Sequence, residues 1–203
     1  MLLNINPDNP EQRKIQQVVD ALEKGGVIIY PTDTVYGLGC DITQPQAVEK
    51  ICRLRNLDPA KAMLSFICSD ISEVAGYTLP ISTPVFKLMH KNLPGPFTFV
   101  LNSNNQVPKL FKNKKRTIGV RIPSHPVPLA IVKALGRPIL SLSLKSDNEI
   151  TEYFTDPEDF KDDFMKLVDI IVDSGAGKNV PSTIVDCTGE TPELIREGAG
   201  ELL

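Results

Sequence analysis

The sequence lacks several features that would assign it to a familiar class of protein. It has no Trp, only two His and four Cys, and no two cysteines stand in a C-x-x-C pair. This scarcity of ligands argues against a zinc site and predicts buried, reduced thiols. No apolar run approaches the roughly 20 residues of a membrane span, and the first residues lack the pattern of a secretory signal peptide. We therefore expect a cytoplasmic protein with no membrane partner.

Acidic residues are missing from one long stretch of the chain. Between Glu73 and Asp147 there is no Asp or Glu, although this stretch holds half of the 22 Lys and Arg residues. The chain as a whole is acidic, with a formal net charge of -3. Segregated positive charge attracts anions such as phosphates. A pI near 5.5 argues against tight duplex binding by the whole surface. Charge alone leaves two readings open, an anion site and a solvated basic surface.

The length of 203 residues, with no internal repeat and no long linker, predicts one domain spanning residues 1–203. Apolar runs predict strands at 26–30, 63–68, 97–101, 117–121, 139–143, 168–172 and 183–187. Helical spacing and end signals predict helices at 10–25, 45–55, 83–91, 126–135 and 157–166, with Asn9 as the N-cap of the first. Helices and strands mostly alternate, which favours a layered α/β fold with a substantially parallel or mixed sheet.

Polar residues gather where the predicted strands end. The segment 31–41, PTDTVYGLGCD, follows the first strand and is expected to be a loop with two hydroxyls and two glycines. Strand ends in α/β domains open onto ligand crevices, although glycine-containing turns are also common structural elements. Arg121 ends another strand with no acid nearby in the sequence. Ser141 and Ser143 are expected on one face of the strand 139–143, because side chains alternate along a strand.

Five segments, in this order, resemble the YrdC/YciO family, whose best-known members are threonylcarbamoyl-AMP synthases. They are residues 31–41, 94–101, 117–126, 181–189 and 195–200. The resemblance spans nearly the whole chain. It implies a twisted mixed sheet with helices on both faces and a deep, positively charged cavity. In that cavity ATP, L-threonine and bicarbonate would become threonylcarbamoyl-AMP and pyrophosphate. The product would pass to partner proteins that modify certain tRNAs next to the anticodon.

The resemblance also implies roles for individual residues. Threonine or its carbamate would be held by Thr34, Arg121, Ser141 and Ser182. The nucleotide would be bound by Arg55, Lys61, Thr117, Ser143, Lys145 and Arg196. Arg55, Lys61 and Arg121 would position the substrates, with no residue assigned as an acid or base. Mg²⁺ would enter with ATP rather than through protein ligands. A carboxylate near the cavity would repel a triphosphate, so the acid-free stretch is expected to keep carboxylates away from it.

Two positions depart from the family pattern. Typical synthases carry Lys-x-Arg-Pro before the second predicted strand and Ser-x-Asn after a later one. An ungapped comparison places Leu57 at the second cation and Lys145 at the asparagine. Both departures resemble the YciO branch and predict synthase activity that is weak or altered in substrate.

Two other functions stay open at this point. The basic residues Lys112, Lys114, Lys115 and Arg116 are candidates for binding double-stranded RNA or tRNA. A nucleotide sensor that kept the cavity and lost catalysis is the second alternative.

Overall fold

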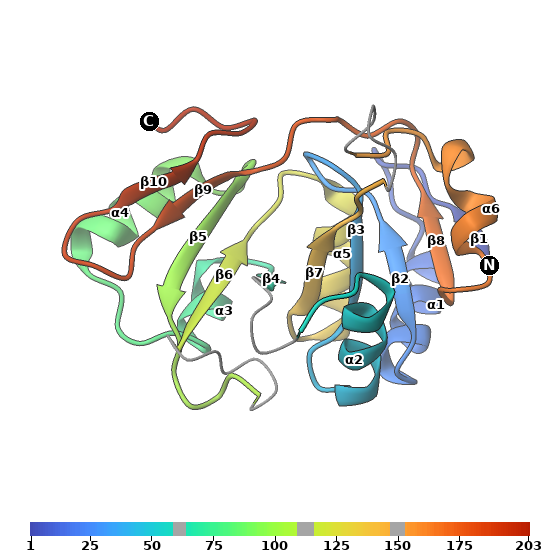
Figure 1. Cartoon of the computed structure of the whole chain (residues 1–203), viewed down its shortest axis with the longest axis horizontal. Helices are drawn as coiled ribbons and strands as arrows, with labels where there is room; N and C mark the ends of the chain where they lie inside the picture. Colours follow the sequence, from blue (N-terminus) through green and yellow to red (C-terminus); the bar gives the residue numbers. More distant parts are fainter. Residues whose placement is uncertain (59–63, 109–115, 147–152) are drawn as a thin grey trace.

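The computed structural model describes residues 1–58, 64–108, 116–146 and 153–203. Within these residues one ten-stranded mixed sheet crosses the molecule in the order β1-β8-β2-β3-β7-β4-β6-β5-β9-β10 (Figure 1). The strands are β1 (Leu2–Asn4), β2 (Val27–Tyr30), β3 (Gly37–Asp41), β4 (Ser65–Ile67), β5 (Phe97–Asn102), β6 (Thr117–Arg121), β7 (Ile139–Ser143), β8 (Ile170–Asp173), β9 (Thr183–Asp186) and β10 (Glu193–Arg196). The predicted α/β class with a mixed sheet is confirmed.

Helices lie on both faces of the sheet. They are α1 (Gln12–Glu23), α2 (Pro45–Leu54), α3 (Ile71–Ala75), α4 (Thr83–Asn92), α5 (Pro126–Leu135), the 3₁₀ helix η2 (Pro157–Asp159) and α6 (Lys161–Phe164). Side chains alternate along β2, so Ile28 and Tyr30 join the apolar residues of α1 and α5 in one core cluster. Val27 and Ile29 join the residues of α2 in another. Two cores therefore hold the central sheet between helices.

Some predicted element boundaries are wrong. The N-cap of α1 is Glu11 rather than Asn9, and the Glu11 carboxylate accepts hydrogen bonds from Lys14 Nζ and the Asn6 amide instead of capping the helix. The predicted helix 157–166 is broken into η2 and α6. Phe160 lies at the break, with its ring buried and 5.4 Å from the centroid of Tyr36. The burial of the Phe160 ring against Tyr36 is therefore favoured over a continuous helix through this residue.

The segment 31–41 is only partly a loop. Residues Gly37–Asp41 form β3, which pairs antiparallel with both β2 and β7. Glycines disfavour strands when nothing packs on them, which is why the sequence predicted a loop. The short outer strands β1 and β10 were also not predicted. Both lie at the sheet edges, where few apolar residues are needed.

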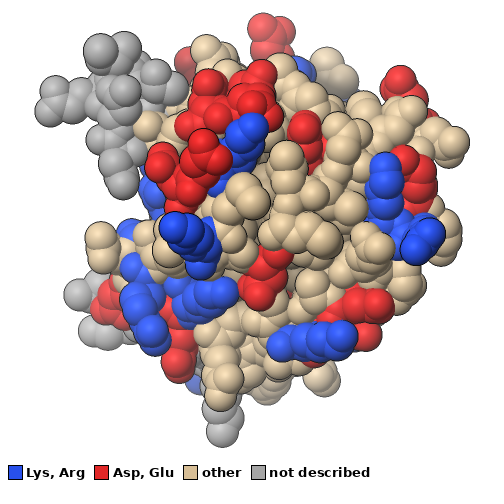
Figure 2. Space-filling model, turned by 90° about the vertical axis from the view of Figure 1, so that its right-hand side faces the viewer, with Lys and Arg blue, Asp and Glu red and all other residues tan. Residues whose placement is uncertain are grey.

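The surface carries both signs of charge. Figure 2 shows acidic side chains gathered at the upper end of one face, where η2 and α6 contribute Glu158, Asp159, Asp162 and Asp163. All four cysteines are buried and free, as expected. No helix in the described ranges is long and apolar enough to span a membrane.

Helix α5 begins with a titratable cap. His125 is the N-cap, and its Nδ1 accepts a hydrogen bond from the Val127 amide at 3.2 Å. This contact requires a neutral imidazole. Burial lowers the pKa of His125, and the negative charge of Asp33 opposes this shift. The cap therefore links the stability of α5 to pH.

We predict that His125→Asn reduces the loss of stability at mildly acidic pH. Asparagine caps helices well and does not titrate. The unfolded chain binds a proton at His125 with a pKa of about 6.5. The stability that the histidine contributes is therefore present above that pH and is lost as pH falls through the lowered folded value. Melting temperatures at pH 7.5 and 5.5 should differ less in the variant than in the parent. Equal differences would contradict the assignment.

Candidate functional site

A pocket of about 430 Å³ opens in the half of the sheet that runs from β7 to β10. Its lining residues are Arg55, Leu57, Leu64, Ser65, Phe66, Thr98, Val100, Thr117, Ile118, Gly119, Arg121, Ser141, Leu142, Ser143, Lys145, Tyr153, Ser182, Ile184 and Arg196. The lining thus combines hydroxyl groups and cations with apolar side chains. Such mixed, concave surfaces are typical of small-molecule sites.

Small residues form a row across the sheet beneath this pocket. In register, Gly39 of β3 lies beside Ser141 of β7, Ser141 beside Ser65 of β4, and Ser65 beside Gly119 of β6. A Cβ atom at Gly119 would lie only 2.7 Å from Ser65 Oγ. Glycine and serine side chains occupy little volume. Because neighbouring strands carry them at paired positions, space is left above the sheet for the pocket.

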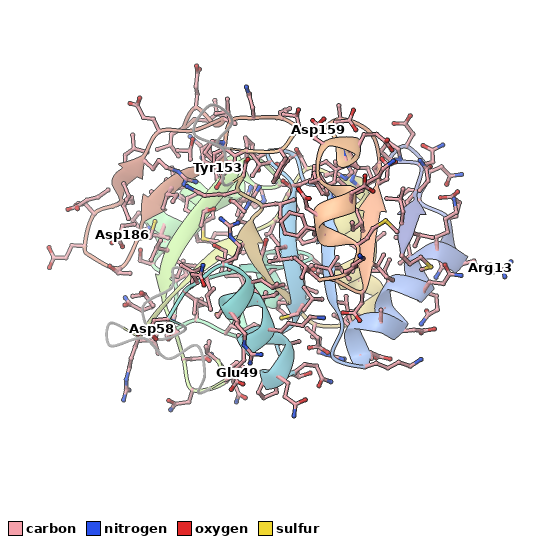
Figure 3. The ribbon with its side chains drawn as sticks, turned by 45° about the vertical axis from the view of Figure 1, so that its right-hand side comes forward. Arg13, Glu49, Asp58, Tyr153, Asp159 and Asp186 are labelled. Atoms are coloured by element: carbon pink, nitrogen blue, oxygen red, sulfur yellow. The ribbon has the colours of Figure 1, made fainter. Side chains whose placement is uncertain are left out.

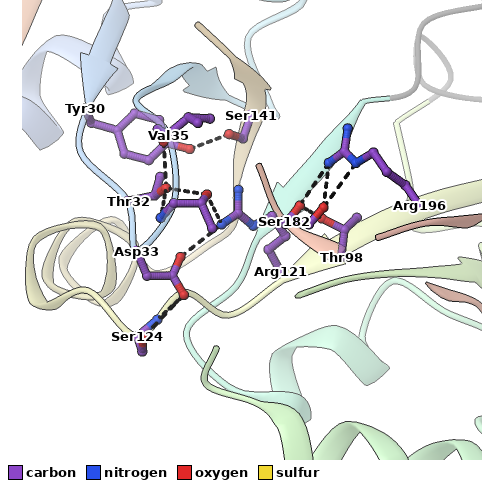
Figure 4. Close-up of polar contacts among 11 residues, drawn as sticks. Tyr30, Thr32, Asp33, Val35, Thr98, Arg121, Ser124, Ser141, Ser182 and Arg196 are labelled. Carbon is purple, nitrogen blue, oxygen red and sulfur yellow. Dashed lines mark hydrogen bonds and ion pairs between the residues drawn. The ribbon is translucent and has the colours of Figure 1, made fainter. Parts of the chain in front are cut away.

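Tyr30 packs on this row of small residues and contacts Ser141, which lines the pocket. Its ring covers β3, where a Cβ at Gly37 or Gly39 would lie 2.9 or 2.8 Å from ring atoms. The hydroxyl then donates a 2.5 Å hydrogen bond to Ser141 Oγ (Figure 4). Burial raises the pKa of Tyr30, which keeps the phenol protonated and able to donate. The two glycines thus allow a buried tyrosine to orient a pocket serine.

Arg121 brings a buried cation to the pocket. Its side chain is 7% exposed, and Nη2 donates to Asp33 Oδ1 at 3.0 Å and to Thr34 Oγ1 at 2.9 Å (Figure 4). Its Nε is buried and has no hydrogen-bond partner among the described residues. A buried donor without an acceptor is unfavourable. Because Arg121 lines the pocket, its guanidinium is a candidate donor to an oxygen of a ligand.

The Asp33 contact corrects two expectations. Arg121 does have an acidic partner, and a carboxylate does lie beside the pocket wall. Both were missed because Asp33 precedes the acid-free stretch and is 88 residues from Arg121 in the sequence. Thr34 is fully buried behind Arg121 and does not line the pocket.

The other end of the pocket is closed by the C-terminal strands. Arg196 donates from Nη2 and Nε to the Ser182 carbonyl at 2.7 and 3.2 Å. Ser182 Oγ shares a 2.8 Å hydrogen bond with Thr98 Oγ1 of β5. Gly198 lies so close to this strand that a Cβ would be 2.4 Å from the Pro181 carbonyl. The glycine at 198 therefore lets the segment after β10 pack against β9 and fixes Arg196 in the wall.

The end of α2 forms a third wall. Asn56 has a positive φ of 49°, and the Leu57 and Asn56 amides donate to the Cys52 and Arg53 carbonyls. This is a Schellman motif, which fixes the chain direction after a helix. It leaves Arg55 and Leu57 in the pocket lining, where Arg55 Nη1 donates to the Lys145 carbonyl at 2.9 Å.

Lys145 and Tyr153 stand together in the lining. The two residues form an antiparallel bridge, and Lys145 Nζ lies 5.3 Å from the centroid of the Tyr153 ring. A cation at that distance over a ring is attracted to it. Figure 3 shows Tyr153 in the same half of the molecule as Asp186 of β9, away from Arg13 of α1.

The structure brings most of the predicted site residues together. Arg55, Thr117, Arg121, Ser141, Ser143, Lys145, Ser182 and Arg196 all line the pocket. Lys61, Lys112, Lys114 and Lys115 lie outside the described residues, and Arg116 is exposed. Ser65, Thr98 and Tyr153 also line the pocket and were not predicted from the sequence. Ser65 and Thr98 are single polar residues within apolar strands, a signal that was available. No group of three potential metal ligands occurs in the part of the chain that the structure describes.

Comparison with models of known protein families shows to which family this chain belongs. The Sua5/YciO/YrdC family model, described as telomere recombination, matches residues 20–198. The chain belongs to this family. That residue range includes all the strands of the pocket.

Relatives of this chain include a protein named YciO and a protein named threonylcarbamoyl-AMP synthase. Uncharacterized protein YciO of Escherichia coli K12 is 44% identical over 200 residues, 98% of this chain and 95% of YciO. The crystal structure of E. coli YciO has a TM-score of 0.92 at 42% identity, covering 99% of this chain and 97% of that one. Threonylcarbamoyl-AMP synthase of Vibrio campbellii is 29% identical over 196 residues, 92% of this chain and 100% of the synthase. The expected likeness to YciO is confirmed.

A related structure at 26% identity contains L-threonine. The crystal structure of P. abyssi Sua5 complexed with L-threonine has a TM-score of 0.88 at 26% identity. It covers 98% of this chain, which spans 57% of the Sua5 chain.

We predict that Gly39→Ala destabilises this family member by about 1–3 kcal/mol, the usual cost of overpacking. The new methyl group would lie 2.8 Å from both the Leu140 carbonyl oxygen and the Tyr30 ring. Urea unfolding measures the change. Gly189→Ala is the matched control, because its nearest neighbour would be 3.9 Å away. Equal stability of the two variants would contradict the packing of Tyr30 on β3.

Proposed function

We propose that this chain is a nucleotidyltransferase of the threonylcarbamoyl-AMP synthase type, with weak activity. The observation that carries the proposal is that Arg121, whose buried Nε has no hydrogen-bond partner among the described residues, lines a pocket with hydroxyls and further cations. The family membership adds support, because relatives include a protein named threonylcarbamoyl-AMP synthase and a Sua5 crystallised with L-threonine.

The proposed reaction has two steps. The amine of L-threonine combines with bicarbonate, and water leaves as the carbamate forms. A carbamate oxygen then attacks the α-phosphorus of ATP. The bond between that phosphorus and the oxygen leading to the β-phosphate breaks, and pyrophosphate leaves. Mg²⁺ accompanies ATP as part of the substrate, and the product is passed to proteins that modify tRNA.

Positioning and charge account for the proposed catalysis. Arg121, Ser141 and Ser182 would hold threonine and its carbamate, with Thr34 supporting Arg121 from behind. The nucleotide would lie toward Arg55, Thr117, Ser143, Lys145 and Arg196, and Lys61 would join them. Arginine suits both substrates, because its planar group forms paired hydrogen bonds with carboxylate and phosphate oxygens.

The proposed weak activity is explained by two residues of the pocket lining, Leu57 and Lys145. Leu57 is an apolar residue at a position where typical synthases carry a second cation. Lys145 adds a charge, but its ammonium rests over Tyr153 and lacks the fork of a guanidinium. One preorganised donor contributes about 3 kcal/mol to a transition state. The loss of one would reduce the rate without removing the pocket.

An activity measurement tests the proposal directly. Purified protein with ATP, Mg²⁺, L-threonine and bicarbonate should produce a threonine adduct of AMP that mass spectrometry detects. Omitting bicarbonate or replacing L-threonine with L-valine should abolish the product. No product above the blank, together with heat stabilisation by ATP, would instead indicate a nucleotide sensor.

We also predict that Leu57→Arg combined with Lys145→Asn raises kcat at least tenfold. The double variant restores the guanidinium and amide of typical synthases, so it should strengthen contacts to the departing pyrophosphate. Leu79→Arg is the control, because Leu79 is 51% exposed and does not line the pocket. An unchanged or lower kcat in the double variant would contradict this account of the weak activity.

A further inference from the structure

Asp33 is the buried acid that contacts the pocket's buried cation. Its side chain and that of Arg121 are each 7% exposed, and Asp33 Oδ1 accepts from Arg121 Nη2 at 3.0 Å. Asp33 lies in the loop that follows β2, whereas Arg121 ends β6. The pair therefore joins two segments that are far apart in the sequence.

Both carboxylate oxygens of Asp33 are occupied. Oδ2 accepts from the Ser124 amide at 3.0 Å and from Ser124 Oγ at 3.3 Å. Ser124 precedes the cap of α5. Asp33 is therefore fixed from one side by the start of that helix and fixes Arg121 on the other side (Figure 4).

These contacts determine which part of Arg121 faces a ligand. Asp33 and Thr34 together take the Nη2 group. Nε remains buried, with no hydrogen-bond partner in the described part of the chain. A guanidinium held at one nitrogen by two acceptors has little freedom to rotate. Its remaining donors are then presented in a fixed direction.

We infer that Asp33 is a positioning residue for Arg121, which it orients so that Nε donates to a carboxylate of the bound amino acid. The inference rests on the proposed function and adds a residue to it. Asp33 also offsets most of the charge of Arg121. By contrast, Arg55 and Arg196 donate to uncharged main-chain carbonyls, so these contacts leave their positive charge in place.

This difference assigns different anions to Arg121 and to the other two arginines. The nearly neutral Asp33–Arg121 pair suits a singly charged carboxylate, which it recognises through the direction of its hydrogen bonds. Arg55 and Arg196, which line other walls of the pocket, suit a triphosphate, which is attracted by charge. Asp33 should therefore affect amino-acid binding and leave nucleotide binding almost unchanged.

The chain contains a matched control pair. Asp41 is fully buried and accepts from Arg137 Nε and Nη2, with Nε 3.0 Å from Oδ2. Neither residue lines the pocket. Asp33→Asn and Asp41→Asn therefore make the same chemical change at two buried carboxylates that are paired with arginines, and only the first of these pairs borders the site.

Isothermal titration with L-threonine and, separately, with ATP tests the inference. An amide at position 33 has one acceptor oxygen, so it cannot accept from both Arg121 and the Ser124 amide. Asp33→Asn should weaken L-threonine binding at least tenfold and change ATP binding less than twofold. Asp41→Asn should lower the melting temperature without changing either affinity. Unchanged L-threonine affinity in Asp33→Asn would overturn the inference, as would an equal loss for both ligands.

Asp33→Glu provides a second variant in case Asp33→Asn does not fold. It keeps the charge and moves the carboxylate by one methylene group. A fivefold or greater loss of L-threonine affinity supports the inference, and parental affinity overturns it.

A spectroscopic readout separates this inference from the proposed function. The Arg121 Nε–H signal in a ¹H–¹⁵N spectrum can be assigned by its loss in Arg121→Lys. It should be sharp in the parent and broadened by exchange in the folded position-33 variant, whether or not a ligand binds. A parent that binds neither L-threonine nor ATP refutes the proposed function alone. An equally sharp signal in the position-33 variant refutes the role of Asp33.

Discussion

The ion pair between Arg121 and Asp33 is the contact on which the rest of the site depends. A guanidinium buried without a carboxylate is strongly destabilising, and removing one member of such a pair costs about 3–5 kcal/mol. The pair joins the loop after β2, the end of β6 and the start of α5. It thus ties the half of the sheet that contains β2 to the half that holds the pocket. Nε, which has no hydrogen-bond partner within the described ranges, is the donor that we propose for a ligand.

The volume of the pocket has a separate origin in the glycines. Gly119 leaves space beside Ser65, and Gly39 lets Tyr30 reach Ser141. Strands rarely tolerate glycine unless a neighbour packs closely on it. Here the neighbours are a tyrosine ring and a serine hydroxyl. The same residues that weaken the strands therefore create the floor of the site and orient its hydroxyl groups.

Sequence reasoning predicted the class of fold and much of the pocket. Ser141 and Ser143 were recognised because polar residues at a strand end break an apolar pattern, and Thr117 through the resemblance to the family. Strand β3 was missed, because the packing of Tyr30 on its glycines is a tertiary contact that local propensity does not contain. Asp33 was not assigned to Arg121 for the same reason. Charge patterning along the chain could not reveal a partner that the sheet brings from outside the acid-free stretch.

The acid-free stretch between Glu73 and Asp147 contributes less positive charge to the pocket than its composition suggested. Of its charged residues, Arg121 and Lys145 line the pocket, and the first of these is balanced by an acid. A crystal structure with L-threonine and ATP tests the central claim most directly. The account predicts the threonine carboxylate within hydrogen-bond distance of Arg121 Nε, with the phosphates toward Arg55 and Arg196. Threonine bound elsewhere, or with its carboxylate directed away from Arg121, would contradict it.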